Sequence, residues 1–292
     1  VQIAYPRRAH AEALAEQLQM HIVYTENSFI NESLDMRMLG VNYQTKIYEI
    51  TGISNNNQKF EKESLLTAIA NAVEINYTAT SGTTPEKRKT EHQRIYFWND
   101  SLTQALPLGE ITAQALPYQQ QNLELTQDII DEFNSEGTKI TTTMLQNDGK
   151  YLQDGSNWWI VSEIQSFDAS AFYLPVSVTD PFGNVTSLIY DEYHLMIEQI
   201  TDALLYETLV FNDYRVLQAW KITDPNGNSQ SVAFDALGMV KALAVSGKNS
   251  GEGDNLTDPT IKYEYNLLNW RDNQKPVYSH VESRETHGDP DS

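Results

Sequence analysis

Histidines and carboxylates, the side chains that most often carry chemistry, are spread through this sequence without the spacing of a known site. The six histidines include no His-x-x-x-His or His-Glu-x-x-His pair, so a zinc site would need ligands from distant parts of the chain. The absence of cysteine excludes disulfides, thiolate metal ligands and a cysteine nucleophile. The sequence therefore predicts no metal site and no cofactor.

Acidic pairs offer general acid–base chemistry, for example Glu252 with Asp254, or Asp128 with Asp131 and Glu132. A hydrolase needs two carboxylates in one cleft with well-separated pKa values. Because the chain has 40 acidic and 20 basic residues, such pairs arise without any functional role. The sequence also has no Gly-x-Ser-x-Gly elbow, phosphate-binding loop or dinucleotide fingerprint. We predict no catalytic residue, and a hydrolase remains a third hypothesis.

A turn motif occurs twice with nearly the same residues. Thr-Asp-Pro-Phe-Gly-Asn at 179–184 leads to Tyr-Asp at 190–191, and Thr-Asp-Pro-Asn-Gly-Asn at 223–228 leads to Phe-Asp at 234–235, 44 residues later. Proline pre-sets φ and glycine supplies positive φ, so each motif predicts a tight turn between strands. The residues that we assign to these turns, as structural positions, are Asp180, Pro181, Gly183, Asp191, Asp224, Pro225, Gly227, Asp235 and Gly238.

Side chains alternate after each turn, which is the period of a strand. Thr186, Leu188 and Tyr190 share one face, and Phe234 takes the same place as Tyr190 in the second copy. Asp191 and Asp235 open a second turn, which contains Gly238 in one copy and no glycine in the other. A third, degenerate copy is predicted from Asp258-Pro259 to Asn266. Repetition of this kind predicts stacked antiparallel hairpins.

The second copy also resembles part of a calcium loop. Asp224, Asn226 and Asn228 fall at alternate positions around Gly227. A full calcium loop needs a further carboxylate at a fixed distance downstream, and residues 229–233 offer none. Together with Pro225, this favours a plain turn.

Composition limits the partners of the chain. A net charge of −20 argues against nucleic acid and against direct contact with anionic membranes, since both need clustered cations. The longest basic run, Lys87-Arg88-Lys89, follows Pro85 and is expected in a solvated loop. No apolar run reaches the ~20 residues of a membrane span. Hydrophobic residues make up 40% of the chain, which suits a sheet with two partly wet faces.

The first half of the chain is predicted to mix strands with a few helices. Helices are expected at 9–20, 60–73 and 125–133, and Asn55–Asn57 is expected to be a loop. Strands are expected at 21–24, 45–50, 74–80, 94–98 and 138–145. Asn147–Lys150 is a hairpin signal. Trp158 and Trp159 should face opposite sides of a strand, with one in the core and one at a rim.

At the turn motifs the chain resembles the YD, or RHS, repeat family. It further resembles the B component of bacterial insecticidal toxin complexes at Ala4–Arg8, Tyr24–Ser28, Tyr43–Glu49 and Phe172–Pro175. The self-cleaving module of the repeat family has an Asp-Pro-x-Gly-Leu pattern, which neither turn matches, so that activity is not carried over.

The resemblance implies a mainly β chain of antiparallel hairpin repeats, forming part of a spirally wound shell with a few short helices in the N-terminal half. We expect a β-rich region at 1–170 and the repeat region at 171–292. In relatives, the B component joins a C component to enclose a toxic cargo, which leaves through a pore-forming A component. The expected role is thus non-enzymatic and structural, in a secreted or extracellular complex.

Two further expectations concern the limits of the chain and an alternative role. The start at Val1 shows no signal-peptide pattern, and the polar end suggests a piece of a longer polypeptide. The alternative is a β-rich surface module that binds glycans or a protein partner through exposed aromatics, with Trp158 as the candidate sugar platform.

Overall fold

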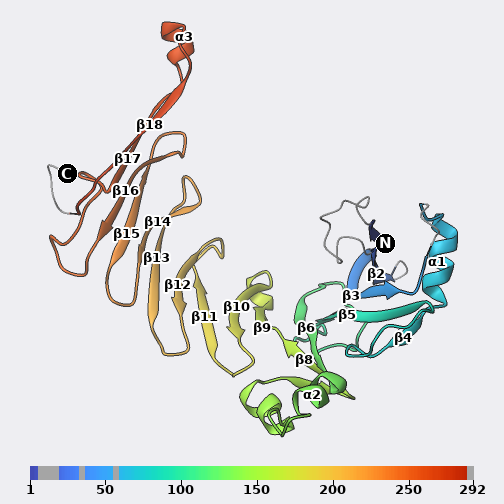
Figure 1. Ribbon diagram of the computed structural model, residues 1–292. Helices are drawn as coiled ribbons and strands as arrows, with labels where there is room; N and C mark the ends of the chain where they lie inside the picture. The colour runs from blue at the N-terminus through green and yellow to red at the C-terminus, as the bar shows by residue number, and fades with distance from the viewer. Residues whose placement is uncertain (6–19, 33–36, 55–58, 288–292) are drawn as a thin grey trace. The chain divides into compact units, whose positions relative to one another are not determined.

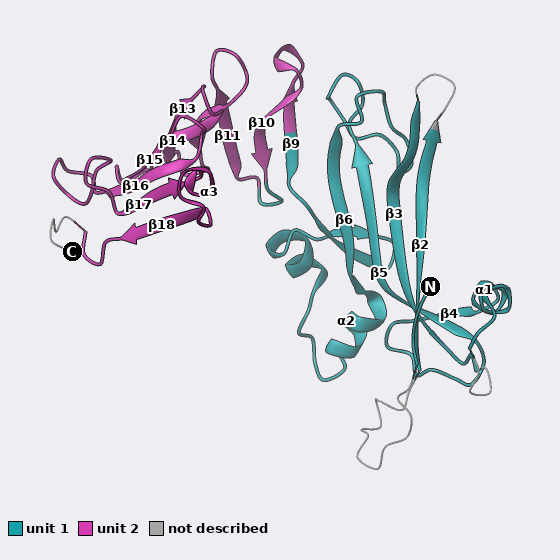
Figure 2. Ribbon diagram, turned by 90° about the horizontal axis from the view of Figure 1, so that it is seen from above, with its two compact units in different colours: residues 1–165, 180–182 teal, residues 166–179, 183–292 magenta. Residues whose placement is uncertain are grey.

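A computed structural model describes residues 1–5, 20–32, 37–54 and 59–287 (Figure 1). The chain is mainly antiparallel β, as the sequence predicted. It packs as two compact units, one of residues 1–165 with 180–182 and one of residues 166–179 with 183–292, which Figure 2 colours separately. The predicted boundary at 170/171 remains a proposal. The helix expected at 9–20 lies outside the described residues except for Met20, which is not helical, and the loop at Asn55–Asn57 also lies outside them.

The first unit contains an eight-stranded sheet in the order β1-β2-β3-β5-β6-β8-β7, with β4 parallel to β5. Its long central strands pair antiparallel (Figure 1). The strands are β1 Gln2–Ala4, β2 His21–Glu32, β3 Met38–Thr51, β4 Val73–Ile75, β5 Glu86–Phe97, β6 Pro117–Thr126, β7 Leu152–Asp154 and β8 Asn157–Val161. The helices are α1 Lys62–Ala70, α2 Gln127–Phe133 and a π-helix at Met144–Asp148.

Three hydrophobic clusters hold this unit together. Leu65 and Ile69 of α1 pack against Ile22, Tyr48 and Ile50 of the sheet. The other two clusters are Ile30 with Phe97 and Ile111, and Ile130 of α2 with Leu145 and Trp158. Helices and loops therefore cover the sheet, and burial of these apolar side chains stabilises the unit.

The second unit contains a ten-stranded sheet in which each strand pairs with its neighbours in sequence, from β9 to β18 (Figure 1). The strands are β9 Ile164–Asp168, β10 Leu174–Thr179, β11 Val185–Tyr190, β12 Ile197–Thr201, β13 Glu207–Asp213, β14 Gln218–Thr223, β15 Ser229–Phe234, β16 Val240–Ser246, β17 Ile261–Asn266 and β18 Tyr278–Ser283. Two short helices accompany it, a 3₁₀ turn at Ala169–Ala171 and α3 at Asn269–Asn273. Among its described residues, the buried hydrophobic side chains are alanines, Ala171, Ala242 and Ala244. This sheet is a single layer.

Several local predictions are wrong. The basic run Lys87-Arg88-Lys89 lies inside β5, where Arg88 bonds to Glu49 at 3.0 Å and Lys89 to Glu74 at 2.8 Å. Carboxylates on the neighbouring strands β3 and β4 therefore neutralise the charges of Arg88 and Lys89. These contacts link residues far apart in the sequence, so the sequence alone predicted a solvated loop. The strand expected at 74–80 ends at Ile75.

The stretch 138–145 is not a strand. The Asn134 side chain holds the backbone of Lys139 and Ile140, and the Thr141 hydroxyl accepts the N–H of Met144, which starts a helical turn. Asn147–Lys150 ends that turn and forms no hairpin, because the N–H of Gly149 donates to the carbonyl of Met144. Side-chain caps of this kind compete with strand pairing.

Both tryptophans are buried, each with 1% of its surface exposed, so the predicted rim position is wrong. They do face opposite sides of β8. Trp158 packs against Ile130 and Leu145. Trp159 lies under the Arg94 guanidinium at 3.5 Å from its ring centroid and under the edge of His92 at 4.8 Å.

Candidate functional site

The turns of the ten-stranded sheet recur with a shorter period than the 44 residues that separate the two sequence motifs. An aspartate opens every turn from the β10–β11 connection to the β15–β16 connection, at intervals of 11 residues. They are Asp180, Asp191, Asp202, Asp213, Asp224 and Asp235. Alternate members belong to opposite rims, since successive strands run in opposite directions.

Each aspartate side chain binds the backbone of its own turn. Asp180 Oδ1 accepts the N–H of Phe182 at 2.9 Å, and Asp213 Oδ1 accepts that of Arg215 at 2.9 Å. Asp235 Oδ1 accepts two N–H groups, from Leu237 and Met239. Such bonds are those of an Asx-turn, and they satisfy donors that the strand ladder leaves unpaired.

The predicted glycines lie at the positions of positive φ. Gly183, Gly227 and Gly238 have φ of +86°, +91° and +83°, each three residues after the aspartate. The glycine-free turn at Asp191 uses His194 at φ 54°, and the turn at Asp202 uses Leu205 at φ 64°. Pro181 and Pro225 directly follow the aspartates of one rim.

Sequence reasoning missed Asp202 and Asp213, which complete the series. Their turns lack both proline and glycine, so they do not repeat the motif letter for letter. The available signal was Thr-Asp at 179–180, 201–202 and 223–224, a spacing of 22 residues. The predicted third copy differs in the structure, because β17 ends at Asn266 and α3 follows from Asn269.

A β-bulge recurs in every second hairpin. The register shifts at Ile189/Tyr190, Phe211/Asn212 and Ala233/Phe234, in each case just before the turn aspartate. A bulge bends and twists its strand. The same bend therefore enters the sheet once for every pair of strands, which curves it in a regular way.

Asp191 differs from the other turn aspartates because it is buried. Its Oδ1 accepts the N–H of Leu195 at 2.7 Å, and its Oδ2 accepts the Tyr214 hydroxyl at 2.8 Å. Burial acts to raise the pKa of this carboxyl, but the Leu195 and Tyr214 bonds outweigh it and hold the pKa below its usual range. The same contact raises the pKa of Tyr214 to about 12.

Four of the five acidic residues singled out in the sequence have side-chain partners in the structure. Asp128 accepts two bonds from Thr78, and Asp131 accepts one from Gln127. Glu252 binds Asn249, and Asp254 binds Arg284. Among the described residues, no group of three or more His, Cys, Asp or Glu is placed to hold a metal ion. None of the helices in the described part of the chain is long and apolar enough to cross a membrane.

The second unit has exposed aromatic side chains that line a groove. Phe211 and Trp220 contact each other at 6.0 Å between ring centroids, and with Ile189 and Leu209 they line a groove of about 430 Å³. Trp158 is buried and offers no face to a sugar, so it is the wrong candidate for a glycan platform.

Solved structures share this fold. The chain superimposes on a crystal structure of TcdB2-TccC3 with a TM-score of 0.72 and 18% identity, covering 96% of this chain and 16% of that one. A crystal structure of TcdB2-TccC3-Cdc42 gives a TM-score of 0.66 at 18% identity, covering 92% and 15%. TcdB2-TccC3 without its hypervariable C-terminal region gives 0.66 at 17% identity, covering 92% and 14%.

The comparison confirms the resemblance at the level of the fold. The chain spans about a sixth of the length of the solved structures that it matches. No family model matches the sequence, and no curated protein matches it.

Proposed function

We propose that this chain is a non-enzymatic wall segment of a toxin-complex B component, part of a hollow β-shell that encloses a toxic cargo. The observation that carries the proposal is the superposition of 96% of the chain on TcdB2-TccC3. In this role the chain would act with a C component and its cargo, and with a pore-forming A component outside this segment. The complex would be secreted or extracellular.

The architecture of the second unit supports a wall. Its sheet is one layer thick, and consecutive strands protect each other's edges along the chain. The side chains of the turn aspartates accept hydrogen bonds from the backbone of their own turns, so their role is to fix the turn conformation. The regular bulges add curvature, which a closed container needs.

The proposal predicts that the two faces of the sheet differ in access after assembly. Leu209 lies opposite Thr223, and Val210 lies opposite Ile222, so Leu209 and Ile222 belong to opposite faces. Their exposures are similar, 37% and 43%, and the chain has no cysteine of its own. Leu209→Cys and Ile222→Cys thus form a matched pair of reporters.

The test is labelling with a polymer-linked maleimide too large to enter a shell. In the chain alone, both cysteines should react. In the polypeptide assembled with its C component, one of the two should become protected from the polymer and still react with a small maleimide. Equal polymer labelling of both sites in the assembly would contradict a closed shell.

A second candidate function is glycan binding in the Phe211–Trp220 groove. Trp220 is 38% exposed there, beside the amide side chains of Gln199 and Asn212, and aromatic faces with nearby amides suit a sugar ring. Glycan-array binding that is lost on Trp220→Ala and kept on Trp270→Ala, an exposed control on α3, would favour this function. Absence of array binding would exclude it for the glycans on the array.

A further inference from the structure

The connection between β16 and β17 is longer than the other turns of the second unit and departs from their 11-residue spacing. The preceding turn occupies 235–239, whereas this connection runs over 247–260. Loops of this length within a compact sheet are uncommon and are often functional. The loop is therefore longer than the connection between two paired strands requires, and its additional residues can form a binding site.

The loop is internally braced. The Glu252 carboxylate accepts the Asn249 backbone N–H at 3.1 Å and its side-chain amide at 2.7 Å. The Gly247 N–H donates to the Glu252 carbonyl, and the Asp254 N–H donates to the Val245 carbonyl. A Cβ on Gly253 would lie 2.6 Å from the Val245 carbonyl oxygen, so the close approach of the loop to the β16 backbone requires glycine at this position. The loop is thus held over the sheet without a ligand.

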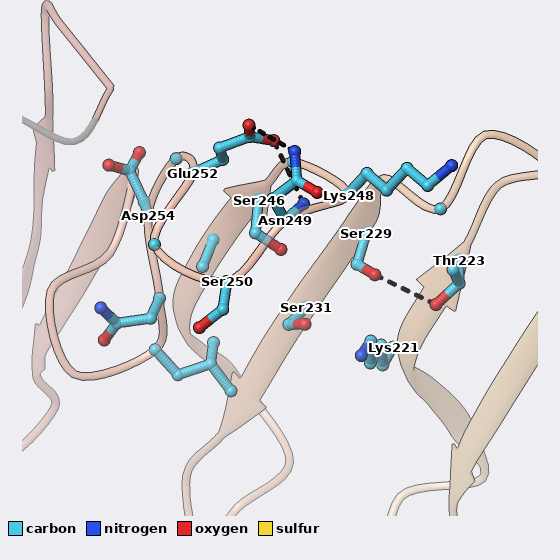
Figure 3. Close-up of a pocket in the computed structure, with 17 residues that line it drawn as sticks. Lys221, Thr223, Ser229, Ser231, Ser246, Lys248, Asn249, Ser250, Glu252 and Asp254 are labelled. Atoms are coloured by element: carbon cyan, nitrogen blue, oxygen red, sulfur yellow. Dashed lines mark hydrogen bonds between the residues drawn. The ribbon is translucent and has the colours of Figure 1, made fainter.

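A cavity of about 420 Å³ lies between this loop and one face of β14–β16 (Figure 3). Two rungs of paired residues form its floor, Thr223–Ser229–Ser246 and Lys221–Ser231–Ala244. Because these side chains are short, they leave open space and present hydroxyl groups, which both donate and accept hydrogen bonds. Ser250 adds a further hydroxyl from the loop.

Two lysines line the same cavity. Lys221 comes from β14, and Lys248 from the loop stretches over the β14–β15 turn (Figure 3). Gly227 makes room for it, since a Cβ there would lie 3.1 Å from Lys248 Cγ. The Lys221 ammonium lies 5.7 Å from the Phe211 ring centroid.

Neither lysine is ion-paired with a carboxylate around the cavity. Within the described residues, neither forms a salt bridge; Lys87 and Lys241 form none either, but they do not line this cavity. The two acidic residues of the lining contact other groups: Glu252 accepts hydrogen bonds from Asn249 and keeps its negative charge, and Asp254 forms an ion pair with Arg284. In a chain of net charge −20, two lysines without a carboxylate partner at one cavity call for an anionic ligand.

We propose that this cavity binds an oxyanion, a phosphate or sulfate group that is free or carried as a monoester. Lys221 and Lys248 supply the positive charge, and the hydroxyls of Ser231 and Ser246 donate hydrogen bonds to its oxygens. The Ser229 hydroxyl, 3.0 Å from the Thr223 hydroxyl, donates to the ligand while it accepts the bond from Thr223. The proposal does not rest on the container role, because the lining comes from one loop and three neighbouring strands and needs no other part of an assembly.

The test is titration of the full chain with phosphate, sulfate and O-phosphoserine by calorimetry at constant ionic strength. Saturable binding of at least one of the three is expected. Lys221→Gln and Lys248→Gln should each weaken it about tenfold or more, the usual loss for a charge-assisted bond. Lys241→Gln, an exposed lysine of β16 outside the cavity, should leave the affinity unchanged. Circular dichroism checks that each variant is folded.

Two results would overturn the proposal. One is the absence of saturable binding of all three ligands to the folded wild-type chain. The other is binding that all three lysine variants retain equally. A rise in melting temperature that grows linearly with sulfate in every variant would not count as binding, since excluded salts stabilise any fold.

Discussion

Asp191 illustrates how one residue of a repeat can take an added role. It opens its turn like the other aspartates, yet it alone of the six is buried, and it accepts the Tyr214 hydroxyl from the next turn of the same rim. The contact joins these two turns directly, in addition to the β12–β13 ladder that links their hairpins. A charge held by donors in this way couples the stability of the sheet to pH.

Asp191→Asn is expected to lower the melting temperature at pH 7, because the amide is a weaker acceptor for Leu195 and Tyr214. The lowered pKa of Asp191 contributes stability that is present above pH ~4 and lost as the pH falls through the folded-state value. The variant should therefore lose less stability than wild type on acidification, as measured by thermal unfolding from pH 7 to 2.

The control is Asp202→Asn, an aspartate of the opposite rim that is half-buried and accepts backbone N–H groups only. A smaller decrease in melting temperature is expected there. If wild type and Asp191→Asn showed the same slope with pH, the carboxylate would not be the coupled group.

At the scale of elements, five of the six hairpin turns reuse one geometry with different residues. The third position after the aspartate has positive φ whether it is Gly183, Leu205 or Gly227, whereas in the turn at Asp213 the positive φ falls one residue later, at Leu217. A left-handed backbone costs an ordinary residue ~1 kcal/mol or more relative to glycine. The turn at Leu205 thus carries strain that its glycine-containing relatives avoid.

Leu205→Gly is expected to stabilise the protein by about 1 kcal/mol, since the Leu205 side chain is largely exposed and its removal loses little packing. Gly183→Ala should destabilise by a similar ~1 kcal/mol through the backbone alone, because nothing lies within 4 Å of the new Cβ. Urea unfolding midpoints measure both. Destabilisation by Leu205→Gly would mean that its side chain makes a needed contact.

The 22-residue spacing also predicts which deletions the sheet tolerates. Deleting 202–223 joins Thr201 to Asp224 and rebuilds the Thr-Asp junction of the same rim, so the remaining strands keep their direction and faces. Deleting 213–223 removes a single strand and turn, which reverses the strands that follow and exchanges their two faces. The first variant should be soluble with a cooperative thermal transition, and the second should aggregate. Equal behaviour of the two deletions would argue against the two-strand repeat as the structural unit.

At the scale of the whole molecule, the two units are stabilised in different ways. The three hydrophobic clusters of the described residues all lie in the first unit. The second relies on strand pairing, turn caps and half-buried side chains on both faces. Local opening is easier where few apolar contacts must be broken.

Hydrogen exchange should therefore distinguish the units in the full chain. Amides of β3, β5 and β6 are expected to exchange more slowly than those of β11–β14, by about tenfold or more. Exchange followed by mass spectrometry measures this for each peptide. Equal protection in both units would show that the single-layer sheet has a source of stability beyond pairing and turns.

The sequence alone was sufficient for features that depend on local backbone chemistry. Asp-Pro-x-Gly-Asn specifies a turn through the φ preferences of proline and glycine, and alternation specifies a strand, so the antiparallel β class and the turn sites at Asp180 and Asp224 were predictable. The helices predicted at 60–73, from the spacing of apolar residues, and at 125–133 are present over 62–70 and 127–133.

Only the tertiary structure decided the features that depend on distant neighbours. Trp159 is buried because Arg94 and His92 of another strand cover it, and the Lys87–Lys89 run forms a strand because Glu49 and Glu74 lie beside it. The turns at Asp202 and Asp213 form without glycine because pairing on both sides fixes their length. Local preferences amount to ~1 kcal/mol per residue, and cross-strand contacts of similar size override them where several act together.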